Sequence, residues 1–307
     1  MGLFGFFKSN EAQVLDELIA AGFEISSCDF NCSDCQSKYP SSMKVQDDSE
    51  GPLWKSTKPR GLHILVATGK TDWPHDATGT SGTLAHATSK WASSAEGKIS
   101  LDDTSDAINV NTTSLALQAY ERGDQDALDE KKGDLLLLPF FVWVRNVTGD
   151  NVGATLNKVV PELVKLRLNN VLNFPQNLSG GANVLVEAYE VGLIVFLCSH
   201  RTRDKKCGIT APILKKEMDL YLRDLGLYRD SGDTRPGGTQ VAFINHIGGH
   251  KYAANVIVYL KNSGKNVWLA RCSPNNVKPI IDETVVNDGK VWPLKVRLAQ
   301  KHLPVAW

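Results

Sequence analysis

Leu193-Ile194-Val195-Phe196-Leu197-Cys198 is a continuous apolar run that ends in a cysteine. A run in which apolar and polar residues do not alternate is typical of a strand buried on both faces. The basic segment 199–206 follows, and Cys207 closes it. From Thr210, a suitable helix N-cap with Pro212 in the first turn, apolar residues recur at helical spacing. The stretch therefore predicts a strand, a loop with a cysteine at each end, and a helix that begins near Thr210.

Two histidines follow the next apolar run, 241–244, in the segment His246-Ile247-Gly248-Gly249-His250. Zinc-protease helices have this His-x-x-x-His spacing, but here the glutamate after the first histidine is missing, and two adjacent glycines are poor in a helix interior. A Gly-Gly turn instead allows the backbone to approach a cofactor closely while both imidazoles face it. The two cysteines and two histidines, at the ends of consecutive strands, together predict a metal site.

The chemistry of that site has three interpretations at this point. Both cysteines lie beside basic residues and near a helix N-terminus, which favours the metal-binding thiolate. The site fits an electron-transfer or redox-sensing iron–sulfur protein, a thioredoxin-like thiol oxidoreductase with exposed reactive cysteines, or a zinc-stabilised interaction module. Each residue taken alone is as well explained by an ordinary loop histidine or a small buried cysteine.

A competing metal site lies near the N-terminus, where Cys28, Cys32 and Cys35 form a C-x3-C-x2-C pattern. Three sulfur atoms could hold zinc with one more ligand, or Cys32 and Cys35 could form a redox pair. The surrounding sequence is polar and turn-like, and no second cysteine pair or histidine follows at zinc-finger spacing. Plain loop thiols are the third interpretation of this cluster.

The segments 198–208 and 248–255 resemble the sucrase/ferredoxin-like family, whose members are thioredoxin-fold ferredoxins. The resemblance covers most of the chain and includes Asp72-Trp73-Pro74-His75-Asp76. It implies a 2Fe–2S cluster with two cysteine and two histidine ligands. Carried over position by position, these ligands are Cys198, Cys207, His246 and His250. Lys206-Cys207 stands where some relatives have a Cys-Cys pair, so a cluster with cysteine ligands alone is not expected.

The resemblance implies a one-electron transfer protein with a role in the oxidative or xenobiotic stress response. It favours such a protein over an enzyme with its own substrate. Imidazole ligands leave a cluster less negative than four thiolates do, which raises its potential, and their second ring proton allows coupling to proton transfer. The neighbouring cations of segment 201–206 raise the potential further or form a docking patch for an acidic redox partner. His200 is expected to lie beside the site without being a ligand.

The predicted fold is α/β, with two thioredoxin-like units at 61–180 and 181–307 after an N-terminal helix and mobile connection at 1–60. The first unit is expected to be a degenerate copy without a cluster, because Thr68 stands where Cys198 stands in the second. Its predicted elements are a strand over 63–68, a helix over 82–91, further strand over 135–144 and a helix over 154–172. The best boundary between the units is 173–183, which contains Pro175, Gly180 and Gly181.

The second unit is expected to be a thioredoxin-like ferredoxin domain that carries the cluster. Its two strand runs, with the helix between them, are followed by predicted strands over 256–260 and 267–271 and by a closing helix over 276–286. This order, βαβ and then ββα, is the thioredoxin pattern. The first strand-to-helix turn, where a thioredoxin keeps its redox cysteines, is lengthened here.

Composition limits the classes of partner. The 307 residues include 34 basic and 34 acidic side chains, which argues against general binding to nucleic acid or anionic membranes. No apolar run approaches the length of a membrane span, and no nucleotide-binding fingerprint is present. Cysteines that bind metal need a reducing compartment, which suggests a cytoplasmic protein.

The electron donor and acceptor are therefore expected to be external redox proteins. Iron–sulfur proteins of this kind often end in an aromatic residue that the cytosolic iron–sulfur assembly machinery reads, and Trp307 fits that pattern. Ala306 departs from it, because an acidic residue is usual before the aromatic one.

Overall fold

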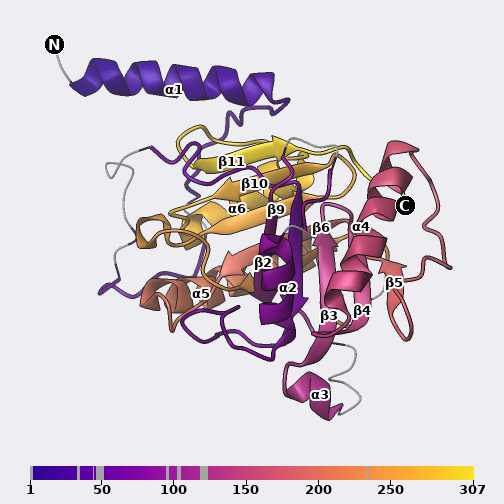
Figure 1. Ribbon diagram of the computed structural model, residues 1–307. Helices are drawn as coiled ribbons and strands as arrows, with labels where there is room; N and C mark the ends of the chain where they lie inside the picture. Colours follow the sequence, from indigo (N-terminus) through magenta and orange to yellow (C-terminus); the bar gives the residue numbers. More distant parts are fainter. Residues whose placement is uncertain are drawn as a thin grey trace.

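The computed structural model describes residues 3–32, 35–43, 45, 52–94, 97–101, 105–117, 124–233 and 235–307 (Figure 1). Its helices are α1 Leu3–Ala20, α2 Leu84–Ser93, α3 Gln125–Leu128, α4 Val152–Leu168, α5 Lys205–Asp224, α6 Val277–Pro279, the 3-10 turns η3 His250–Tyr252 and η4 Pro274–Asn276, and the π-helical η5 Ile280–Val286. Its strands are β1 Leu62–Ala67, β2 Ile108–Thr113, β3 Lys132–Leu138, β4 Val142–Thr148, β5 Leu185–Ala188, β6 Leu193–Cys198, β7 Tyr228–Arg229, β8 Thr239–Ile244, β9 Val256–Leu260, β10 Lys265–Leu269 and β11 Val296–Lys301.

All these strands belong to one mixed sheet, in the order β11-β10-β9-β6-β8-β2-β1-β3-β4-β5, with β7 paired to β8. The same strand order occurs twice, outward from the middle. In the first half β1 is parallel to β2 and antiparallel to β3, and β4 and β5 follow antiparallel. In the second half β6 is parallel to β8 and antiparallel to β9, and β10 and β11 follow antiparallel. The fold class is thus α/β, as predicted, with the topology of one half repeated in the other.

The two halves of the sheet meet where β2 and β8 touch at one register position. The hydrogen bonds there are related as if by a twofold axis: the Ser114 N–H donates to the Phe243 carbonyl (3.0 Å), and the Asn245 N–H donates to the Thr112 carbonyl (3.1 Å). The side chains repeat the relation, because Ser114 Oγ accepts from the Phe243 N–H and Asn245 Oδ1 accepts from the Thr112 N–H. The backbone hydrogen bonding therefore runs from one half into the other.

Alternate residues of the central strands point to different cores. In β1, Ile64 packs on the side covered by α2 and α4, whereas Leu65 packs on the opposite side. In β6, Val195 packs on the side covered by α5 and η5, whereas Phe196 joins the cluster that contains Leu65. The two half-sheets thus face each other across a shared apolar core, and helices cover both outer faces (Figure 1). Each fully buried Leu or Phe in such a core contributes about 1.5–3 kcal/mol.

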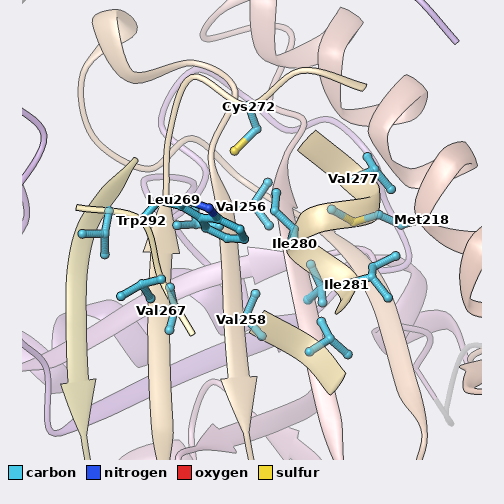
Figure 2. Close-up of a cluster of buried hydrophobic side chains, with 14 of the residues drawn as sticks. Met218, Val256, Val258, Val267, Leu269, Cys272, Val277, Ile280, Ile281 and Trp292 are labelled. Carbon is cyan, nitrogen blue, oxygen red and sulfur yellow. The ribbon is translucent and has the colours of Figure 1, made fainter. Parts of the chain in front are cut away.

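Figure 2 shows the outer core of the second half. Val256 and Val258 of β9 lie beside Val267 of β10, facing Ile280 and Ile281 of η5. Their β-branched side chains suit a pleated surface. The strand predicted over 256–260 is confirmed, and the strand predicted over 267–271 is present but begins and ends two residues earlier, at 265–269. The closing helix predicted over 276–286 is also confirmed, as the succession η4, α6 and η5.

The structure corrects three expectations about elements. Helix α5 begins at Lys205 rather than near Thr210, because the Asp204 side chain accepts a hydrogen bond from the Lys206 N–H and caps it. The segment 135–144 is not one strand: β3 ends at Leu138 and reverses into β4, in antiparallel register. Strands β2, β5, β7 and β11 were not predicted. Strand β2 is mostly polar, and β5 and β7 are only four and two residues long.

Across the described ranges, no helix is long and apolar enough to cross a membrane.

Candidate metal centre

The predicted ligands lie at one edge of the sheet, where the parallel strands β6 and β8 both end. Cys198 is the last residue of β6, and Cys207 lies in the first turn of α5. His246 follows β8 by two residues, and His250 begins η3. We call residues 199–204 the cysteine loop and residues 245–252 the histidine loop. Because parallel strands end at the same sheet edge, segments far apart in sequence meet here.

Three of the four predicted ligands form a compact donor group. The sulfur atoms of Cys198 and Cys207 are 3.2 Å apart, and each lies 3.8 Å from Nδ1 of His246. The sulfur separation is well beyond the roughly 2.05 Å of a disulfide, so both thiols are free. In the part of the chain that the structure describes, this is the one group of three or more Cys, His, Asp or Glu side chains whose donor atoms lie within 4.8 Å of one another.

The two thiols differ in electrostatics although both are buried. The hydrogen bond with Cys207, followed by that with His246, lowers the pKa of Cys198 to about 5, although burial opposes the shift. The hydrogen bond with Cys198 and burial raise the pKa of Cys207 above its usual range. A cation that binds both sulfur atoms would displace the remaining thiol proton.

His250 lies beside this group with its ring turned toward a carboxylate. Its Nδ1 is 2.9 Å from Oδ2 of Asp204, and its ring centroid is 5.2 Å from that of His246. The imidazole side chain is 66 % exposed, whereas the Asp204 side chain is 8 % exposed. With Nδ1 engaged by the carboxylate, Nε2 is the ring atom left for a metal, which is the usual arrangement of a carboxylate behind a histidine ligand.

The histidine loop has the Gly-Gly turn that the sequence predicted. Gly248 and Gly249 have φ of +54° and +60°, a region that favours glycine. A Cβ on Gly248 would also meet the guanidinium of Arg297 at 3.3 Å. Arg297, in β11, is almost fully buried; it donates to the Ile247 carbonyl and stacks on Tyr252, 4.0 Å from the ring centroid. Sequence reasoning missed this residue, since nothing local links position 297 to the loop.

His200 lies beside the predicted ligands, as expected, and packs against His246 and Trp73. Its Nδ1 accepts a hydrogen bond from the His246 N–H (3.1 Å), so its Nε2–H is the donor to the Trp73 carbonyl (2.9 Å). Both ring nitrogens are thus engaged, and the ring is buried.

The competing cysteine cluster does not assemble into a donor group. Cys28 is exposed and Cys32 and Cys35 are partly buried, and among the described residues they do not join a set of three close ligand atoms. Ser33 and Asp34, between the last two cysteines, lie outside the described residues.

The topology, with cysteines and histidines gathered at the end of two parallel strands, defines an α/β protein with a candidate metal-binding edge. The chain belongs to the sucrase/ferredoxin-like family, whose model matches residues 53–298.

Among its relatives is actin patches distal protein 1 of Saccharomyces cerevisiae, 34 % identical over 98 % of this chain and 99 % of that protein. Altered inheritance of mitochondria protein 32 of Debaryomyces hansenii is 38 % identical over 30 % of this chain and 31 % of its own length. The protein of the same name in Meyerozyma guilliermondii is 37 % identical over 30 % of this chain. No solved structure matches the chain significantly.

Proposed function

We propose that this protein is a one-electron redox protein with a 2Fe–2S cluster held by Cys198, Cys207, His246 and His250. The observation that carries the proposal is the donor group itself: two buried sulfur atoms and one imidazole nitrogen lie within 4.8 Å of one another. The second imidazole lies beside them. Membership of a ferredoxin-like family supports the same function.

The donor set fits this group. Thiolates are the usual protein ligands of iron–sulfur clusters, and histidines replace two of them in Rieske centres, where the potential is higher. When bound, the cluster supplies reversible one-electron chemistry. The residues of the chain shield the sulfur atoms from water, while the exposed ring of His250 connects the site to solvent. Its Nδ1, next to Asp204, is where a proton could accompany the electron.

We further propose that the two halves of the sheet are thioredoxin-like units and that the first holds no cluster. The strand order β8-β6-β9-β10 has the thioredoxin pattern, and β2-β1-β3-β4 repeats it. The register corrects the expected equivalence by one residue. Ala67 pairs with Thr113 as Cys198 pairs with Ile244, so Ala67 takes the place of Cys198 and Thr68 that of Ser199. A methyl group in place of the thiol removes a ligand.

We propose that the protein acts in the cytoplasm with external redox partners. Metal-binding thiols suit the reducing cytoplasm, and external redox proteins would supply and remove the electron in a response to oxidative or xenobiotic stress. Trp307 would be read by the cytosolic iron–sulfur assembly machinery. In the structure its ring packs on Phe174 (centroids 5.6 Å apart) and its Nε1–H donates to the Phe140 carbonyl (3.2 Å). Reading by an assembly factor would require this tail to leave its place.

The test is metal analysis of protein purified without oxygen. The proposal predicts a coloured protein that contains iron and acid-labile sulfide in equal amounts. A colourless protein with bound zinc would instead establish the zinc-stabilised module. Metal-free protein with reactive thiols, after iron–sulfur reconstitution has also failed, would favour the thiol oxidoreductase, although burial of both sulfur atoms argues against it.

A further inference from the structure

The cysteine loop lies against a segment of the first half of the chain. This segment, residues 69–76, follows β1, and it contains the Asp72–Asp76 motif that the function has not yet used. Ser199 Oγ donates to the Thr71 carbonyl at 2.7 Å. The carboxylate of Asp72 accepts two hydrogen bonds from Thr202, from the backbone N–H at 3.0 Å and from the hydroxyl at 2.8 Å. Thr202 is four residues from Cys198 and five from Cys207, so Asp72 is hydrogen-bonded to the middle of the loop.

A second contact reaches the histidine ligand. The Trp73 side chain is buried, and its indole N–H donates to Thr68 Oγ1 at 3.0 Å, which fixes it to the end of β1. Its carbonyl accepts from the His200 ring at 2.9 Å, and the two rings pack edge to face with centroids 5.8 Å apart. His200 in turn accepts from the His246 backbone N–H. A continuous chain of hydrogen bonds thus joins the first half of the molecule to the backbone of a proposed ligand.

The remaining backbone hydrogen bonds of the cysteine loop lie at its two ends, where the Ser199 N–H donates to the Ile244 carbonyl and the Asp204 N–H donates to the His200 carbonyl. Residues 199–203 are Ser-His-Arg-Thr-Arg, with no aliphatic side chain to anchor in a core. Arg201, Thr202 and Arg203 are exposed. Polar loops of this kind keep one conformation only when hydrogen bonds fix their backbone.

We propose that Asp72 and Trp73 are positioning residues of the metal centre, although they belong to the half of the chain that lacks a cysteine at the equivalent position. Through them the first half holds the cysteine loop in the conformation that brings the two thiols together. The half without a cluster is then a working part of the site. The statement about the cluster rests on the proposed function; the restraint on the loop does not.

The restraint is tested by hydrogen exchange in full-length, metal-free protein. In Asp72→Ala, amides of residues 199–207 should exchange about tenfold faster than in the wild type, because hydrogen bonds to a charged group are lost. The matched control is Asp76→Ala in the same segment, whose carboxylate accepts hydrogen bonds from Thr78 in its own loop. This control should leave exchange in the cysteine loop unchanged.

Further variants separate the restraint from a general loss of folding. Asp72→Asn keeps one oxygen acceptor and should give a smaller increase in exchange rate. If the β9 amides of Asp72→Ala also lose protection, that variant is generally destabilised, and Asp72→Asn is used in its place. Thr202→Val removes the hydroxyl donor, and in combination with Asp72→Ala it should add nothing, because both changes break the same interaction. Exchange at wild-type rates in both Asp72 variants would overturn the inference, as would additive effects of the pair.

The effect on the site is measured with Co²⁺, whose absorption bands report thiolate ligation. Asp72→Ala should bind Co²⁺ about tenfold more weakly than the wild type, by the same loss of hydrogen bonds, and Asp76→Ala should not. Equal Co²⁺ affinity in Asp72→Ala and the wild type would overturn the positioning role. Absence of iron from the wild type, with the exchange difference intact, would contradict the proposed cluster and leave the restraint standing.

Discussion

The sulfur atoms of Cys198 and Cys207 lie 3.2 Å apart, one at the end of β6 and the other in the first turn of α5. This closeness depends on where α5 begins. Because Asp204 is its N-cap, the helix already includes Cys207, whose sulfur atom lies beside that of Cys198. The same Asp204 carboxylate faces His250. One side chain therefore fixes the helix start and orients a proposed ligand.

Replacement of Asp204 by Asn tests this double role. Asparagine still caps a helix, but its neutral amide is a weaker acceptor for the His250 ring. We expect metal affinity to fall by roughly 10–100-fold and the midpoint potential of the loaded protein to rise, since the imidazole becomes a poorer electron donor. Asp219→Asn is the control, because Asp219 pairs with Lys215 on the same helix. Equal affinity and potential in Asp204→Asn and the wild type would contradict the orienting role.

Proton coupling should show in the midpoint potential of the loaded wild type. Where one proton accompanies each electron, the potential falls by about 59 mV per pH unit. Replacement of His250 by Cys adds a negative ligand and removes one titrating group, so the potential should be lower and its pH dependence shallower. A wild-type potential that stays flat from about pH 6 to 10 would leave plain electron transfer as the function. Where the potential does change with pH, the fitted pKa values describe the two coupled histidines together and not either one alone.

Folding stability should depend on pH through His63, which is buried between the half-sheets. Its ring is hydrogen-bonded to the Tyr259 hydroxyl and to Asn111 Oδ1, and burial, with the charge of Arg60, lowers its pKa to about 3. The unfolded chain therefore binds this proton first as the pH falls below about 6.5, and stability is lost from there toward pH 3.

The measurement is the free energy of unfolding in urea between pH 7 and 4.5, for wild type and His63→Gln. The variant should be less stable at pH 7 by about 1–3 kcal/mol, through disturbed buried hydrogen bonds. Its stability should fall less steeply with decreasing pH, by up to about 1.4 kcal/mol per unit. Parallel pH profiles for the two proteins would show that His63 is not responsible.

The C-terminal tail is tested by deletion of Trp307. If the assembly machinery reads this residue, cluster occupancy in cells should fall while chemical reconstitution in vitro still succeeds. Phe174→Leu disturbs the packing of the tail but keeps the residue, so its occupancy in cells should stay normal. Normal cluster occupancy in cells for the deletion variant would show that the assembly machinery does not read Trp307.

Much of the site could be predicted because its ligands follow strong local signals. The apolar runs before Cys198 and His246 predicted strands, and both are present as β6 and β8. The start of α5 was misplaced because Thr210 and Pro212 form an attractive local N-terminus, whereas the actual cap, Asp204, is preceded by a basic loop. Local propensity favours a helix that begins near Thr210, whereas the helix that begins at Lys205 is the one that includes Cys207 and brings it to Cys198.

Contacts between distant segments were beyond sequence reasoning. Asp72 and Thr202 are 130 residues apart, and Arg297 reaches the histidine loop from β11. Neither has a neighbour in sequence that predicts its partner. The repeat of strand order was expected, but its register was one residue off, because the end of β1 has no cysteine to mark it.

The central claim is that Cys198 and Cys207, and not the N-terminal cysteines, hold an iron–sulfur cluster. The most direct measurement is the visible absorbance and iron content of single Cys→Ser variants purified without oxygen. We predict that Cys198→Ser and Cys207→Ser lose the cluster, because serine is a poor substitute for thiolate on iron, whereas Cys32→Ser and Cys35→Ser keep it. Loss of colour in the Cys32 and Cys35 variants, with colour retained in Cys198→Ser, would contradict the account.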